Sequence, residues 1–122
     1  MYQIRFYKDR RGNEPVRQFL EELSVRKDRR SVKLYRLIVH DIEYLSRYGF
    51  AVGMPRIRRI DEEVWELRPK RYRIFFFAFH EDCFILLHHF YKKTEKTPRS
   101  EIKKAHREME YYLGKEENHG RQ

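Results

Sequence analysis

The first fifty residues combine one short alternating segment with two helical patterns. "YQIRFY", residues 2–7, alternates polar and apolar side chains and is rich in aromatics, which predicts a strand. "EPVRQFLEEL" follows with Asn13 as the expected N-cap and Pro15 in the first turn of a short helix. A second apolar stripe predicts a helix from Asp28 to a stop at Gly49. The two neighbouring helices predict a helical hairpin packed on a sheet.

After Pro55 the apolar spacing changes from helical to alternating. "RIRRI", "VWELR", "RYRIFFFAF" and "CFILLHHF" predict four strands, and the short gaps between them predict an antiparallel meander. Thr97 and Pro98 then begin a predicted helix that ends at Gly114, and residues 115–122 are expected to be a disordered polar tail. The predicted fold is α+β in the order β-α-α-β-β-β-β-α, with residues 1–114 forming one domain around an antiparallel-rich sheet.

Strand alternation separates two rows of side chains in "VWELRPKRYRIFFFAF". One row is expected to lie under the helices: Trp65, Leu67, Tyr72, Ile74 and Phe76. The other row places Glu66, Arg68 and Arg73 beside exposed Phe75 and Phe77. Arginines beside exposed rings suit nucleic acid, because guanidinium groups bind phosphate and rings stack on bases. A solvated sheet face carrying weak ion pairs explains the same pattern equally well.

The last predicted strand continues into "HHFYKKT". His88 and His89 are adjacent, so they point to opposite faces and cannot chelate one metal ion together. Glu66, Arg68, Arg73, one histidine, Tyr91 and Lys92 or Lys93 are therefore expected to converge in one shallow site. No nucleotide-binding or metalloprotease motif is present, so neither a metal ion nor a cofactor is expected.

The charge balance favours an anionic partner. The 122 residues include 28 Lys and Arg against 19 Asp and Glu, a formal charge of +9, which makes nucleic acid the leading partner class. Cys83 is the single cysteine and lies in an apolar run, so an inert buried thiol is expected. With no signal segment or membrane-spanning run in the sequence, the expected location is the cytoplasm.

Three stretches resemble the phage-derived HigB-like branch of the RelE/ParE toxin superfamily. They are "FYKDRRGNEPVRQFLEEL", "VWELRPKRYRIFFF" and "LLHHFYKKTEKTPRSEIKKAHREMEYY", which together extend the resemblance over residues 2–113. The resemblance implies a toxin of a type II toxin–antitoxin pair. Such a toxin cleaves mRNA, usually on the ribosome and without metal, and is neutralised by an antitoxin that often has a helix-turn-helix.

The resemblance also implies roles for individual residues. Arg73 corresponds to the arginine that stabilises the transition state, Arg68 is the second choice, and Lys92 and Lys93 correspond to a basic pair that grips the backbone. We take Glu66 as the candidate base. The candidate acids are His88, His89 and Tyr91. The predicted RNA-binding set is completed by Lys70, Arg71, Lys96 and Phe75.

The sequence is also compatible with two other functions. A ParE-like protein would poison a protein target such as gyrase without catalysis, and it would not need the Glu, Arg, His and Lys convergence. A phage-derived nucleic-acid-binding module would bind RNA without cutting it. The ends of cleaved RNA would separate a nuclease from both.

Overall fold

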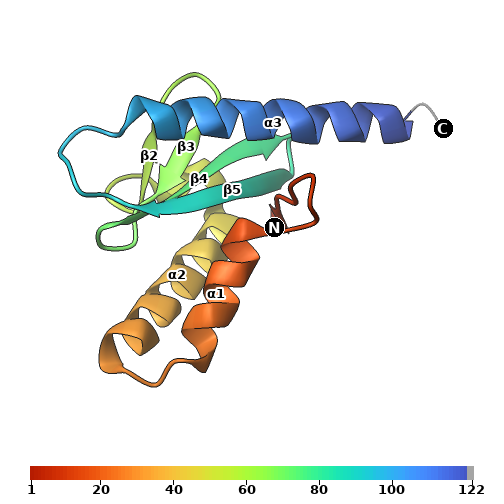
Figure 1. Cartoon of the computed structure of the whole chain (residues 1–122). Helices are drawn as coiled ribbons and strands as arrows, with labels where there is room; N and C mark the ends of the chain where they lie inside the picture. Colours follow the sequence, from red (N-terminus) through yellow and green to blue (C-terminus); the bar gives the residue numbers. More distant parts are fainter. Residues whose placement is uncertain (121–122) are drawn as a thin grey trace.

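The described chain has the predicted α+β class and element order. The structure, a computed structural model, describes residues 1–120 and the side chains of residues 1–117. Figure 1 shows its elements, which are β1 (Gln3–Phe6), α1 (Pro15–Val25), α2 (Arg29–Tyr48), the short 3₁₀ helix η1 (Gly49–Val52), β2 (Ile57–Arg59), β3 (Trp65–Leu67), β4 (Tyr72–Phe79), β5 (Cys83–Tyr91) and α3 (Arg99–Gly120).

Within the described residues the strands form one five-stranded sheet in the order β1-β5-β4-β3-β2. Strands β2 to β5 pair antiparallel in succession, which confirms the predicted meander. Strand β1 lies at the other edge and pairs parallel with β5. The helical hairpin between β1 and the meander supplies the long connection that a parallel neighbour requires.

The boundaries of α1 and α2 follow local chemistry, and one of them differs from prediction. Asp28 caps α2 by accepting a hydrogen bond from the Ser31 backbone N–H at 3.0 Å, and Gly49 ends this helix at φ +60°, both as predicted. Asn13 does not cap α1, because Glu14 occupies that position. The Asn13 N–H instead donates to Asp9 Oδ1 at 2.9 Å and closes the preceding turn.

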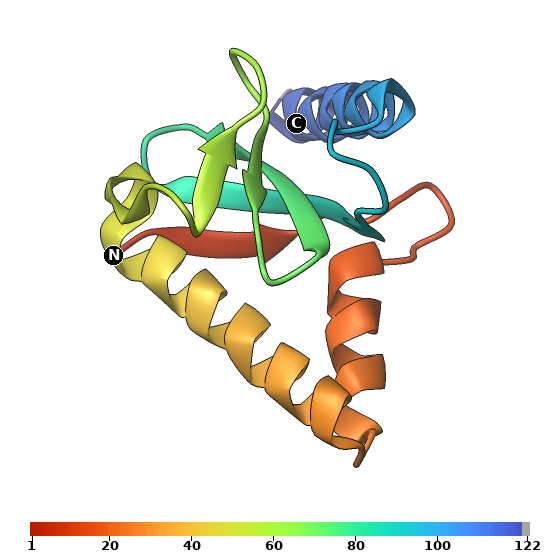
Figure 2. The same cartoon turned by 90° about the vertical axis from the view of Figure 1, so that its left-hand side faces the viewer.

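Helices cover both faces of the sheet. Figures 1 and 2 show the α1–α2 hairpin against one face and α3 across the other. Under the hairpin lie the side chains predicted there, with Ile74 and Phe76 fully buried. Under α3 lie Phe75 and Phe77, packed with Ala105 and Met109 of the helix. The expectation that Phe75 and Phe77 are exposed is therefore wrong, because α3 covers their face of the sheet.

Helix α3 is longer than predicted. It continues through Gly114 to Gly120, so residues 115–120 are not a disordered tail, and residues 121–122 lie outside the described part. A glycine inside a helix costs about 1 kcal/mol relative to alanine, which neighbouring contacts can offset. Lys115 supplies one such contact, with its Nζ 5.5 Å from the centre of the Tyr111 ring.

None of the helices within residues 1–120 combines the length and apolar character that crossing a bilayer requires.

Alanine substitutions at two glycines should change the stability of the fold in opposite directions. A Cβ on Gly49 would lie 2.7 Å from Cε2 of the Tyr2 ring on a backbone with φ +60°, whereas nothing lies within 4 Å of a Cβ on Gly114. We expect Gly49→Ala to lower the free energy of unfolding by about 1–3 kcal/mol, because the clash adds to backbone strain. Gly114→Ala should raise it by about 0.5–1 kcal/mol, because alanine favours the helix.

Urea titration of both variants measures these changes. A loss of stability in Gly114→Ala would contradict a helix that passes through residue 114.

Candidate functional site

Glu66 lies at the centre of a buried charged cluster. Its neighbours across the sheet are Arg58 on β2 and Phe75 on β4, so its side chain points to the α3 face. The carboxylate is fully buried, and its Oε2 lies 3.4 Å from Arg68 Nε and 3.7 Å from Arg73 Nε. These are ion-pair distances that are too long or too poorly aligned for hydrogen bonds. In the described part of the chain, both Glu66 oxygens and both Nε atoms lack a hydrogen-bond partner.

The β3–β4 turn fixes the guanidinium of Arg73. Its Nη1 donates to the carbonyl oxygen of Lys70 at 2.8 Å and to that of Tyr72 at 2.7 Å. Lys70 has φ +55°, a left-handed conformation that is uncommon for a residue with a side chain and is concentrated at functional sites. The turn therefore holds one end of Arg73, while the Nε end faces Glu66.

Burial shifts the pKa values of this cluster. Burial raises the pKa of Glu66 above its ordinary value, although Arg73 and Arg68 oppose the rise. It lowers the pKa of Arg73, and it lowers the pKa of Lys92, where the nearby Arg73 adds to the effect and Glu66 opposes it. One carboxylate thus faces several cations, so the cluster has an excess of positive charge that would favour a second anion.

A shallow cavity opens beside this cluster, which we call the basic cavity. Its volume is about 300 Å³, and it is lined by Lys70, Arg71, Arg73, Lys92, Lys93, Thr94 and Glu95. The expected convergence of Arg73 with Lys92 or Lys93 is thus confirmed, and Lys70 and Arg71 of the predicted RNA-binding set line the same cavity. Their roles stay predictions. Glu66 does not line the cavity, and Lys96 is exposed outside it.

Two reciprocal bonds join Arg71, just before β4, to Lys92, just after β5, and both residues line the basic cavity. The Lys92 backbone N–H donates to the Arg71 carbonyl oxygen at 2.7 Å, and Arg71 Nη2 donates to the Lys92 carbonyl oxygen at 2.9 Å. Lys92 is 8 % exposed and Arg73 is 8 % exposed, so each presents a small accessible surface. Because both side chains line the cavity, a bound anion would contact them there.

The structure does not support Glu66 as a base that touches a substrate. A base must come within hydrogen-bond reach of the proton that it removes. Glu66 has no exposed surface, and Arg68 and Arg73 lie against it. Its position instead suits a counter-charge that orients the two arginines.

The two histidines are held elsewhere. They point to opposite faces, as predicted. His88 is buried with Nδ1 2.5 Å from Glu108 Oε1 and Nε2 3.4 Å from Glu101 Oε2, both on α3. His89 stacks on Phe19 of α1 with ring centres 3.9 Å apart, and burial lowers its pKa. Neither lines the basic cavity, so the expected convergence of a histidine with the arginines is wrong.

Tyr91 also lies away from the Glu66 cluster. It is the neighbour of Tyr72 across β4 and β5, and the two rings pack edge-to-face with centres 5.2 Å apart. This places the Tyr91 ring on the α1–α2 side, whereas Arg73 points to the α3 side. The expectation that Tyr91 converges with Glu66 and Arg73 is therefore wrong. Phe75 is likewise removed from the binding set, because it is fully buried.

Sequence reasoning missed two neighbours of the cluster. Arg58 lies directly across β2 and β3 from Glu66, and its charge acts on the pKa values of Glu66 and Lys92. The alternation in "RIRRI" predicts a strand that contains Arg58. It does not predict the register between β2 and β3 that brings Arg58 opposite Glu66. Met54 Sδ accepts from Arg68 Nη1 at 3.8 Å, a contact between distant residues that no local pattern indicates.

Metal binding and a reactive thiol are the other two kinds of site to consider in the described residues. No group of three or more His, Cys, Asp or Glu side chains within them is placed to hold a metal ion. Cys83 is buried, as predicted, and burial raises the pKa of its thiol.

Comparison with known proteins gives one match. The sequence model of the family described as "Phage derived protein Gp49-like (DUF891)" matches residues 21–110. This range contains α2, the whole antiparallel meander and the first half of α3. No curated protein matches the chain.

The raised pKa of Glu66 predicts a pH-dependent stability. A carboxyl whose folded-state pKa lies above its ordinary value of 4.5 binds its proton more tightly in the folded protein. Its contribution to stability is therefore lost as the pH rises above that value. We expect the free energy of unfolding of Glu66→Gln, relative to the unchanged protein, to increase as the pH is raised from about 4 to about 7.

Asp61→Asn is the control of opposite sign. Burial raises the pKa of Asp61, but hydrogen bonds from His106 and from the backbone N–H groups of Val64 and Glu63 outweigh it, and the net pKa is lowered. Relative to the unchanged protein, the stability of this variant should fall as the pH rises from about 2 to about 4, because a carboxyl with a lowered pKa adds stability above its ordinary value of 3.8 and loses it as the pH falls. Urea titrations across pH measure both differences, and a pH-independent difference for Glu66→Gln would contradict the raised pKa.

Proposed function

The chain belongs to the Gp49-like family of phage-derived proteins, a RelE/toxin-like family, and on this premise we propose that it is a toxin that cleaves mRNA. In this proposal it is the toxin of a type II toxin–antitoxin pair, close to the HigB-like branch, and it acts without a metal ion. The observation that carries the proposal is the basic cavity, where Arg73 and Lys92 reach the surface beside an unsatisfied charged cluster.

RNA supplies most of the chemistry itself. Its 2′-oxygen bonds to the adjacent phosphorus, the bond from phosphorus to the 5′-oxygen breaks, and the 2′-proton leaves to a base. The products are a 2′,3′-cyclic phosphate and a 5′-hydroxyl that takes a proton from water. The protein must orient the backbone, accept one proton and stabilise the extra negative charge on the phosphorane.

The role proposed for each residue depends on whether its side chain can reach a bound substrate. The guanidinium of Arg73 is held by the Lys70 and Tyr72 carbonyl groups, so it is preorganised to stabilise the phosphorane. Arg68 is the second arginine, and the lysines of the basic cavity grip neighbouring phosphates. Glu66 is a positioning residue that orients Arg68 and Arg73.

Lys92 is the proposed base. Its pKa is lowered by burial and by Arg73, which increases the fraction of neutral amine near neutral pH. A neutral amine accepts the 2′-proton, whereas an arginine stays protonated and cannot do so. Lys92 is thus the lysine of the basic cavity whose lowered pKa suits it to accept this proton.

The proposed partners follow from charge and family. A formal charge of +9 favours mRNA, bound on the ribosome, where the RNA is itself surrounded by phosphate. A helix-turn-helix antitoxin would neutralise the toxin, and both would act in the cytoplasm. A non-catalytic poison of gyrase would not need the preorganised arginine, and it would leave RNA uncut.

Arg73→Ala should abolish growth inhibition and lower the rate of RNA cleavage by about a hundredfold or more, because phosphorane stabilisation is lost. Arg73→Lys keeps the charge but loses the planar fork, so it should restore part of the rate. Mapping of cleaved ends in ribosome-bound mRNA measures the rate and tests for the 2′,3′-cyclic phosphate.

Arg36→Ala, an exposed change on α2, is the matched control and should remain toxic. Circular dichroism establishes that each variant is folded. Full toxicity of a folded Arg73→Ala protein would disprove the proposed role of Arg73, and growth inhibition by the unchanged protein without RNA cleavage would disprove the nuclease.

Lys92→Arg separates proton transfer from charge. It keeps a cation in the basic cavity but provides no base, so cleavage should slow by on the order of a hundredfold to ten-thousandfold. The unchanged protein should cleave faster as pH rises through the lowered pKa of Lys92, and Lys92→Arg should lose this rise. Single-turnover rates across pH, corrected for uncatalysed cleavage, measure both, and an unchanged profile in Lys92→Arg would assign the base elsewhere.

A further inference from the structure

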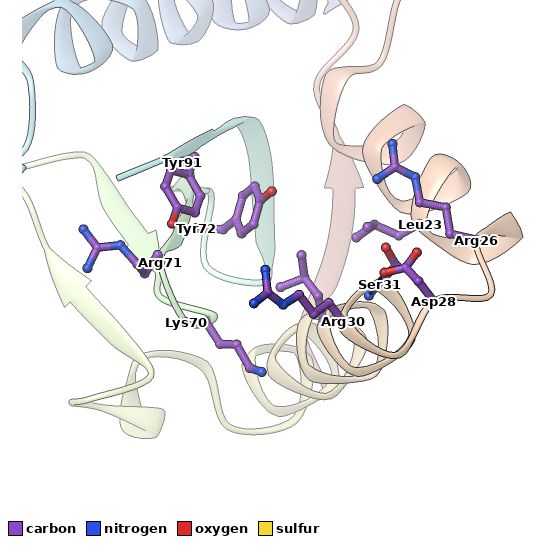
Figure 3. Close-up of a pocket in the computed structure, with 10 residues that line it drawn as sticks. Leu23, Arg26, Asp28, Arg30, Ser31, Lys70, Arg71, Tyr72 and Tyr91 are labelled. Atoms are coloured by element: carbon purple, nitrogen blue, oxygen red, sulfur yellow. Dashed lines mark hydrogen bonds between the residues drawn. The ribbon is translucent and has the colours of Figure 1, made fainter. Parts of the chain in front are cut away.

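A second cavity lies on the other side of the β3–β4 turn, between the sheet and the helical hairpin. We call it the tyrosine cleft. Its volume is about 400 Å³, within the range of small-molecule sites. Figure 3 shows the residues that line it, which are Leu23, Arg26, Asp28, Arg30, Ser31, Leu34, Lys70, Arg71, Tyr72 and Tyr91.

We propose that the tyrosine cleft binds a base of single-stranded RNA by stacking on Tyr91, with Arg30 and Lys70 holding the adjoining phosphate. The inference rests on the proposed function for the identity of the strand as substrate. It adds a binding site on the α1–α2 side of the sheet, away from the Glu66 cluster.

The Tyr91 ring offers a surface for stacking. It is 48 % exposed at the end of β5. The edge-to-face contact with Tyr72 fixes its orientation, and Tyr72 is itself braced by Phe19, with ring centres 5.2 Å apart. The Arg71 guanidinium carbon lies 5.8 Å from the Tyr91 ring centre. A supported, half-exposed ring beside a cation is the arrangement that stacks on unpaired bases.

The charge of the cleft favours an anion. Arg26, Arg30, Lys70 and Arg71 line it, against the single carboxylate of Asp28. That carboxylate is already used, because it caps α2 through the Ser31 N–H at 3.0 Å and this bond lowers its pKa. The Arg26 charge also acts on the Asp28 carboxylate. Within the described residues Arg30 and Lys70 form no ion pair, so these two cations face the cleft without a partner carboxylate.

The two cavities adjoin at the turn. Lys70 and Arg71 line both the tyrosine cleft and the basic cavity. In Figure 3, Lys70 extends from the turn toward Arg30 on α2, while Arg71 and Tyr91 lie on the sheet side. A strand that crosses the turn can therefore place one phosphate at Arg73 and a neighbouring base on Tyr91. An acidic peptide would match the charge, but it would not use the ring.

The test measures binding separately from cleavage. The probe is a short single-stranded RNA with one 2′-deoxynucleotide at the cut position, so that it cannot be cleaved, and its affinity is read by fluorescence anisotropy. Tyr91→Ala should weaken binding by about tenfold, whereas Tyr91→Trp should retain it. Arg30→Gln should weaken binding and reduce its salt dependence by about 0.7 in the logarithmic slope.

Matched controls come from the same chain. Tyr48→Ala removes a tyrosine with a similar exposure of 51 %, and Lys33→Gln removes an exposed cation of α2 that does not line the cleft. Both should bind like the unchanged protein. An RNA with abasic nucleotides around the cut position should bind Tyr91→Ala and the unchanged protein equally, because no base is left to stack.

The outcomes separate this inference from the nuclease proposal. If the unchanged protein cleaves RNA while Tyr91→Ala and Arg30→Gln keep full affinity, the cleft inference is wrong and the nuclease stands. If RNA is bound through Tyr91 and Arg30 but never cut, the cleft stands and the nuclease is wrong. If an oligoglutamate peptide binds the cleft and RNA does not displace it, the occupant is an acidic protein segment and the RNA inference is wrong.

Discussion

The covering of the β4–β5 pair on both faces is the constraint on which the rest of the structure depends. With α1 and α2 on one side and α3 on the other, the two longest strands lie in the middle of the molecule. Charged side chains on the α3 face of β4 and of its neighbour β3 are then surrounded by protein instead of water. Burial of an unpaired charge is costly, so Glu66 and Arg73 lie against each other. Their shifted pKa values follow from the same burial.

The elements could be predicted from the sequence, but the second covered face was not. Helical and alternating periods, together with Asp28, Gly49 and Pro98, define most of the element boundaries correctly. The apolar runs "IFFFAF" and "CFILL" are nearly continuous, which is typical of strands buried on both sides. The alternation of polar and apolar residues in "VWELR" instead predicts a sheet with one solvent-exposed face. The apolar stripe of α3 predicts that this helix packs against another surface. Long-range contacts, such as that of Phe77 with the Tyr112 ring, determine which surface it is.

The candidate site also has one part that could be predicted from the sequence and one that could not. The cations of the basic cavity could be predicted, because they lie at adjoining strand ends and the hairpin register brings strand ends together. Their accessibility could not. Whether Glu66 touches a substrate depends on how Arg68 and α3 cover it, and whether His88 is available depends on Glu108, twenty residues away on another element. Local pattern contains no information about such coverage.

The β3–β4 turn explains how one short segment can serve two faces of a sheet. Successive residues of β4 alternate, so Tyr72 faces the helical hairpin and Arg73 faces α3. Before the strand begins, Lys70 adopts a left-handed conformation, and its carbonyl group bonds Arg73 on one side of the sheet. Its side chain at the same time lines the tyrosine cleft on the other. A more regular turn would lose either the clamp on Arg73 or the cation shared by the two cavities. The left-handed backbone at Lys70 therefore has a structural consequence, because it connects an arginine held by two carbonyl groups to the tyrosine cleft.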